Sequence, residues 1–129
     1  MADTKLTANQ LRRIEEIQGF MTALAHVKKL VLELDSSRAA RVQVIQGVSS
    51  QIARELSQMR QRAIRANIGT LADVAGSLSL TAGRSQGLQM KLRILHEGIV
   101  SLGFQLEHAL KDASTPEEKK PPQTQTPSE

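Results

Sequence analysis

The chain has 129 residues, of which 40% are hydrophobic and 2% aromatic, and it carries a formal net charge of +4. It contains no cysteine, which excludes disulfides, thiolate catalysis and Cys-ligated metals. A core without Trp or Tyr must be built from aliphatic side chains, which favours helices over sheets. No apolar run approaches the roughly 18 residues that span a bilayer, and the first residues are unlike a leader. We therefore expect one helical domain in the cytoplasm.

The first predicted helix runs from about residue 8 to residue 34. Thr7 and Gln10 have the spacing of a capping box, which marks a helix start. Apolar residues then recur at steps of three or four, which is the helical period. They are Leu11, Ile14, Ile17, Met21, Leu24, Val27, Val31 and Leu34, with Phe20 on the same side. The polar run 35–37 predicts a tight connection.

A second predicted helix follows this connection. Its apolar face consists of Ile45, Val48, Ile52, Leu56, Met59 and Ala63. Asn67 and Gly69 then form a common helix ending, and Thr70 could cap a new helix. The apolar spacing nevertheless continues past Gly69, so the sequence leaves open whether the helix breaks there.

The segment after residue 71 presents a similar choice. Its three-and-four spacing continues to Ala109, which alone would predict one long helix. Gly83 and Gly87 each destabilise a helix interior by about 1 kcal/mol relative to Ala. We therefore predict a turn near Gly83, Ser85 as the next N-cap, and a last helix over about 86–111. In the alternative, a continuous helix would carry a smooth ridge that lets another helix approach closely. That ridge comprises Ala75, Ser79, Gly83 and Gly87.

Together these segments predict an all-α protein, an antiparallel bundle of three or four long helices with coiled-coil-like packing. The bundle is expected over residues 7–111, after a short arm at 1–6. Residues 112–129 hold all four prolines and no large apolar residue. Such a segment cannot bury enough surface to fold, so we expect a disordered tail.

Recognisable catalytic and metal-binding patterns are missing from the sequence. The three histidines, His26, His96 and His108, have no metal-ligand spacing. Neither a phosphate-binding glycine loop nor a nucleophile elbow is present. We therefore expect no catalytic residues, no metal and no cofactor.

One stretch allows a different reading. The sequence LAHVKKLV, residues 24–31, resembles the active helix of histidine phosphotransfer domains, which are four-helix bundles of about this size. The resemblance implies that His26 accepts a phosphoryl group and that Lys29 is the family's lysine three residues later. That family has a glycine four residues after the histidine, which leaves room for the partner protein to approach. This chain has Leu30 at that position. In the alternative reading His26 is a solvated surface residue, and Lys29 pairs with Glu33 one turn on.

Basic residues gather in the middle of the chain. Residues 36–96 hold nine Lys or Arg and two Asp or Glu. Four of these arginines lie within three turns of the second helix: Arg54, Arg60, Arg62 and Arg65. Such a surface could bind nucleic acid or an anionic membrane surface. Against this, no Tyr or Trp is available for stacking, both Phe residues are expected beside apolar stripes, and arginine stems can instead cover apolar neighbours.

The strongest pattern is the apolar stripe of the last helix. It consists of Leu88, Leu92, Leu95, Ile99, Leu102 and Leu106, with heptad-like spacing. This stripe could form the core of one bundle or an interface between chains. Apolar residues outside the stripes favour association: Leu30, Leu32, Leu80 and Met90. We therefore predict a non-enzymatic helical interaction or assembly module that binds a second copy or a helical partner.

Overall fold

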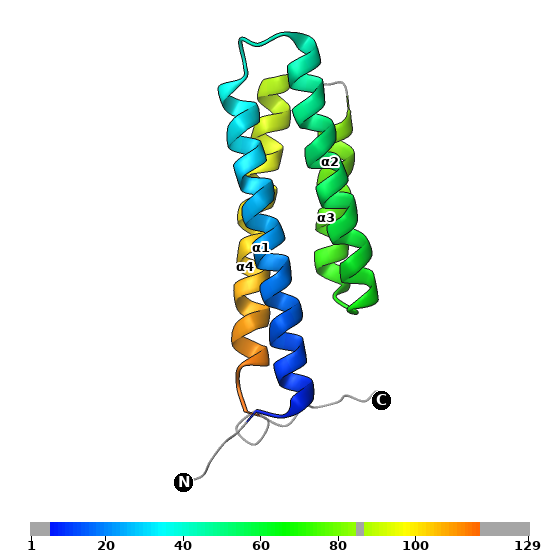
Figure 1. Cartoon of the computed structure of the whole chain (residues 1–129), viewed down its shortest axis with the longest axis vertical. Helices are drawn as coiled ribbons and strands as arrows, with labels where there is room; N and C mark the ends of the chain where they lie inside the picture. Colours follow the sequence, from blue (N-terminus) through cyan, green and yellow to red (C-terminus); the bar gives the residue numbers. More distant parts are fainter. Residues whose placement is uncertain (1–5, 85–86, 117–129) are drawn as a thin grey trace, which may run out of the picture.

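The computed structural model describes residues 6–84 and 87–116, and it shows four α-helices and no strand in these ranges (Figure 1). The helices are α1 (Ala8–Ser36), α2 (Val42–Arg65), α3 (Gly69–Gly83) and α4 (Leu88–Ala113). The predicted all-α bundle is confirmed, with four helices. Residues 1–5 of the predicted arm and 117–129 of the predicted tail lie outside the described residues.

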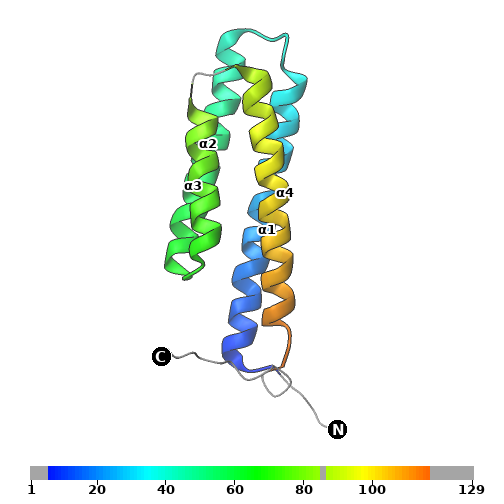
Figure 2. The ribbon, with the colours of Figure 1, turned by 180° about the vertical axis from the view of Figure 1, so that it is seen from behind.

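The four helices form two antiparallel pairs (Figures 1 and 2). α1 packs on α4 and α2 packs on α3, while α1 with α2 and α3 with α4 close the bundle. The α2/α3 pair is the shorter one. The start of α1 and the end of α4 therefore project together beyond the turn that joins α2 to α3 (Figure 2).

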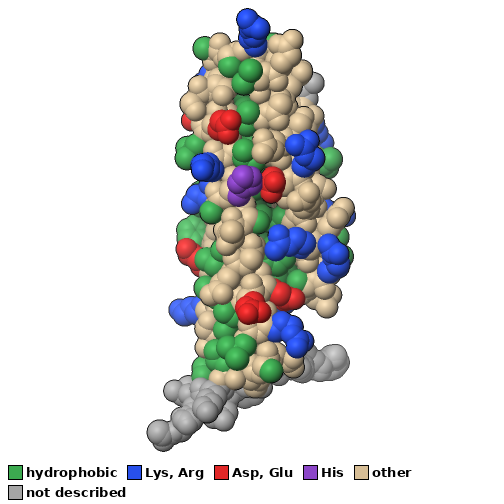
Figure 3. Space-filling view, in the orientation of Figure 1, with side chains coloured by type: hydrophobic (Ala, Val, Ile, Leu, Met, Phe, Trp, Pro, Cys, Tyr) green, Lys and Arg blue, Asp and Glu red, His purple; other side chains and the backbone are tan. Residues whose placement is uncertain are grey.

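Each helix buries one apolar side in a shared core. The outer face of α1 and α2 is more polar, with charged side chains scattered among narrow hydrophobic strips (Figure 3). α1 contacts both α2 and α4, so its buried side is wide and includes Leu30, which the sequence analysis placed outside the stripe. The largest fully buried side chains are Ile17, Phe20, Val27, Leu34, Ile52, Leu56, Met59, Leu71, Leu92, Leu95, Leu102 and Leu106.

The predicted capping box is present at the start of α1. The Thr7 hydroxyl accepts a 3.0 Å hydrogen bond from the Gln10 backbone, and the Gln10 side chain accepts one of 3.0 Å from the Thr7 backbone. The Gln10 amide also donates to the Thr115 carbonyl at 2.6 Å. Gln10 is buried by this contact with the end of α4, whereas Leu11, expected on the core stripe, is exposed.

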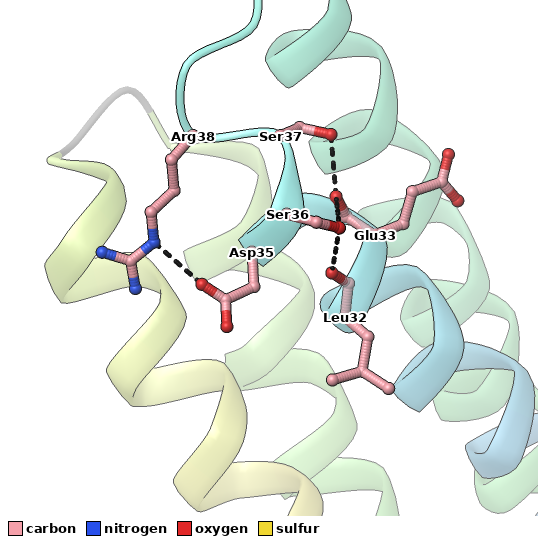
Figure 4. Close-up of polar contacts among 6 residues, drawn as sticks. All are labelled: Leu32, Glu33, Asp35, Ser36, Ser37 and Arg38. Carbon is pink, nitrogen blue, oxygen red and sulfur yellow. Dashed lines mark hydrogen bonds and ion pairs between the residues drawn. The ribbon is translucent and has the colours of Figure 1, made fainter.

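Serine hydroxyls donate hydrogen bonds to backbone carbonyls at the C-terminal end of α1 (Figure 4). Ser36 donates to the Leu32 carbonyl at 2.9 Å and Ser37 to the Glu33 carbonyl at 2.7 Å. These bonds use backbone acceptors of the last helical turns. The connection predicted at 35–37 therefore begins two residues later, because α1 continues through Ser36 and α2 begins at Val42.

The structure has a helix break before Gly69, a point that the sequence left undecided. α2 ends at Arg65, and Asn67 has a φ of 61°, a left-handed conformation that Asn tolerates better than most residues. α3 then begins at Gly69 without a side-chain cap, so Thr70 does not serve as its N-cap.

The turn predicted near Gly83 is confirmed, and the continuous helix is wrong. α3 ends at Gly83, and α4 begins at Leu88 with Gly87 as its N-cap. Ser85, predicted as the N-cap, and residue 86 lie outside the described residues. α4 ends at the buried Ala113, two residues beyond the predicted end, and Thr115, two residues further on, accepts the hydrogen bond from Gln10 of α1.

Small residues set the close approach of α3 to its two neighbours. The Ser79 hydroxyl donates to the Ala53 carbonyl at 2.8 Å, which joins α3 to α2. Of the four residues of the ridge predicted for a continuous helix, Ala75, Ser79 and Gly83 lie in α3, and Gly87 precedes α4. On the other side, a Cβ at Gly98 of α4 would collide with the Leu78 side chain, so only glycine fits there without movement.

Candidate interaction surface

The apolar stripe of α4 lies inside the bundle. Leu92, Leu95, Ile99, Leu102 and Leu106 are buried, and Leu88 is half-buried at the start of the helix. In this fold the stripe packs against helices of its own chain. A second chain would therefore have to use a different surface.

The outer side of α4 offers such a surface. Phe104 is 67% exposed, the largest fraction among the large apolar side chains of the described residues, and Val100 lies one turn before it. Phe104 was expected beside a stripe, and that expectation is wrong. It is two residues from both Leu102 and Leu106, and a step of two turns a side chain about 200° around a helix. Phe104 therefore points away from the core.

A hollow of about 380 Å³ adjoins Phe104. Its lining is mostly apolar and comes from the turn before α3, the start of α3 and the last turns of α4, including Ile68, Leu71, Leu106 and Ala109. Gln105 also lines it, and its buried Oε1 accepts no hydrogen bond within the described residues. The hollow thus combines mostly apolar walls with three polar residues, Thr70, Gln105 and His108.

Other exposed apolar residues do not line this hollow. Three of the four residues singled out in the sequence for association are exposed: Leu32 on α1, Leu80 on α3 and Met90 on α4. The fourth, Leu30, belongs to the core. Single exposed apolar residues are normal on a protein surface, so the pairing of an aromatic ring with an apolar hollow is the more informative feature.

His26 lies on the exposed side of α1, beside α2. Its side chain is about half exposed, and its Nε2 is 3.8 Å from a carboxylate oxygen of Glu55. This carboxylate would repel an incoming phosphoryl group. Leu30, at the position of the phosphotransfer family's glycine, is buried, and among the described residues Lys29 forms no ion pair with Glu33.

The four arginines of α2 spread across its outer side. The Arg62 guanidinium lies 5.1 Å from the centre of the Phe20 ring on the α1 edge, a cation–π contact. The Arg60 stem covers Gly76 on the α3 edge. Arg54 and Arg65 are exposed between these edges. Two of the four side chains are thus engaged in packing, and the guanidinium groups do not converge on one point.

Metal and membrane features were searched in residues 6–84 and 87–116. No group of three or more His, Asp or Glu side chains there could hold a metal ion. None of the four helices has a stretch long and apolar enough to cross a membrane.

Comparisons with protein-family models, with characterised proteins and with solved structures gave no match.

Proposed function

We propose that this protein is a non-enzymatic assembly module that self-associates through the outer side of α4, centred on Phe104. The observation that carries the proposal is an exposed aromatic ring at the edge of an apolar hollow on the same face. The absence of cysteine is compatible with a reducing compartment, and we propose that the protein works in the cytoplasm.

A ring and a hollow on one face suit a two-fold dimer. In such an interface the same surface of each copy meets the other, so Phe104 of one chain enters the hollow of its partner and the reverse contact follows by symmetry. Aromatic side chains that fill pockets are the usual anchors of protein interfaces. Val100, one turn before Phe104, would extend the contact along α4.

The expected dimer is weak. Burying the exposed part of one Phe ring contributes about 3 kcal/mol, so two rings contribute about 6 kcal/mol. Association itself costs at least about 4 kcal/mol in lost translational and rotational freedom. The two rings alone would leave about 2 kcal/mol, a dissociation constant in the tens of millimolar, so a dimer at working concentrations also requires the apolar contacts that Val100 and the walls of the hollow add.

Sedimentation equilibrium tests the proposal. Refractive-index detection is required because the chain lacks Trp and Tyr. The average mass of the natural protein should rise with concentration from 14.1 kDa towards twice that value. Phe104→Asp should stay at the monomer mass, and Leu80→Asp, which changes an equally exposed residue on α3, should behave like the natural protein. A natural protein that remains monomeric at the highest concentration, or association that survives Phe104→Asp, would refute the proposal.

A further inference from the structure

A second hollow lies at the opposite end of the bundle from the protruding ends of α1 and α4. It has a volume of about 450 Å³ and is bounded by the first turns of α2, the end of α3 and the first turn of α4. This size falls in the range of small-molecule sites. Unlike the hollow beside Phe104, it has a mostly polar lining.

Two cations and three neutral polar side chains contribute to this lining. The cations are Arg84 at the end of α3 and Lys91 in α4, and the neutral groups are Gln46, Ser49 and Ser50 of α2. No lining residue in the described part of the chain carries a carboxylate. The side chains in reach of a ligand are therefore positive or neutral, which favours an anion.

Two of these polar residues are almost completely buried. Lys91 is 6% exposed and Ser49 is 4% exposed. Lys91 takes part in none of the ion pairs formed by the described residues, and the Ser49 hydroxyl has no hydrogen-bond partner there. The buried hydroxyl without a partner destabilises the fold, whereas the Lys91 side chain, with its stem buried, contributes to the wall of the hollow and has no counter-ion. Burial accordingly lowers the pKa of Lys91.

A bound oxyanion would supply the partners that Lys91 and Ser49 lack. Its negative charge would pair with Lys91 and Arg84, and its oxygen atoms would accept the hydroxyl hydrogen of Ser49. The hollow is larger than one phosphate group needs, and Val42, Ile45 and Ala82 supply apolar wall for an organic body. We propose that this hollow binds a small phosphate-bearing organic molecule, with Lys91, Arg84 and Ser49 holding the phosphate.

Isothermal titration calorimetry with phenyl phosphate tests the site. The buffer contains no phosphate, and sodium chloride keeps the ionic strength constant. The full chain should bind with one-to-one stoichiometry. Lys91→Met and Ser49→Ala should each weaken binding at least tenfold, the loss expected for one hydrogen bond or ion pair to a charged group. Lys111→Met is the matched control, because it removes an exposed lysine from the far end of the same helix, and it should bind like the natural protein.

Thermal unfolding checks that each variant is folded. Lys91→Met keeps an unbranched apolar stem at a mostly buried position, so the variant should remain folded and lose only the ligand-dependent rise in Tm. Equal affinity in Lys91→Met and Lys111→Met, or no binding by the natural chain, would overturn the proposal. Because Phe104 lies in the other hollow, Phe104→Asp should leave phenyl phosphate binding unchanged, and its loss in this variant would also count against the site.

Discussion

Replacing Gly98 by alanine tests the packing between α3 and α4. The new Cβ would meet both methyl groups and the Cγ of Leu78 at less than contact distance. Leu78 is 4% exposed, so it is enclosed by other side chains and would have to displace them to move away. Overpacking of this kind costs about 1–3 kcal/mol, whereas alanine improves the intrinsic helix propensity by about 1 kcal/mol. We expect a net loss of about 1 kcal/mol in the free energy of unfolding.

Gly47→Ala is the matched control. Gly47 lies within α2, and a Cβ there would have no neighbour within 4 Å. The propensity gain should therefore stand alone, as a stabilisation of about 1 kcal/mol. The two substitutions are chemically identical and differ by about 2 kcal/mol in expected effect. For a domain of this size that difference corresponds to roughly 8 °C in Tm.

Thermal and urea unfolding followed by far-ultraviolet circular dichroism will measure both variants. A third comparison isolates the collision: in a Leu78→Ala background, Gly98→Ala should become stabilising because the obstructing side chain is gone. If Gly98→Ala raises the Tm of the natural protein as much as Gly47→Ala does, α3 and α4 are not in the close contact described above and the reasoning fails.

Three further substitutions follow from the structure. Lys91→Met should raise Tm at neutral pH. Between the lowered pKa of Lys91 in the folded protein and 10.5, the unfolded chain binds more protons than the folded one, so the natural protein gains stability as pH rises. The difference in Tm between the variant and the natural protein should therefore narrow with rising pH, and a constant difference would contradict the burial of Lys91. Thr7→Ala should lower the free energy of unfolding by about 1 kcal/mol because it removes the N-cap of α1. Thr22→Ala, in the middle of the same helix, should lower it by less in the same urea unfolding assay, and equal losses would argue against the cap. Leu95→Ala should lose about 2–5 kcal/mol in urea unfolding, against about 0.5 kcal/mol or less for the exposed Leu32→Ala, and similar values would mean that the stripe is not in the core.

Local sequence features were sufficient to predict the helices and two of their boundaries. The capping pair Thr7 and Gln10 marked the start of α1, because a cap depends on residues three positions apart. Gly83 and its small polar neighbours marked the end of α3, although the apolar spacing continued across them. At Gly69 the same spacing left the choice open, and the left-handed Asn67 is where the chain turns.

The candidate sites depend on contacts that sequence periodicity does not contain. Leu11 precedes Ile14 and Ile17 at steps of three, but two such steps place it about 120° from Ile17 around the helix, so Leu11 is exposed and Gln10 lies on the buried side. Lys91 counted as one more cation of the basic segment, and its burial follows from residues of α2 and α3 that are distant in sequence. The exposure of Phe104 could have been predicted from its angle of about 200° to Leu102 and Leu106 around the helix. The spacing of the apolar residues alone does not show this angle.

The contact of Gln10 with Thr115 also bears on how the chain folds. It closes a loop of 105 residues, whereas the Ser79 to Ala53 bond between α2 and α3 closes one of 26. The longer closure costs about 1.2 kcal/mol more in chain entropy, so the inner hairpin should form first and the outer pair should dock onto it. A circular permutant, in which a linker joins the two ends and the chain is opened between α1 and α2, would make the α1/α4 pair a local hairpin. Its refolding should then be faster than that of the natural chain order.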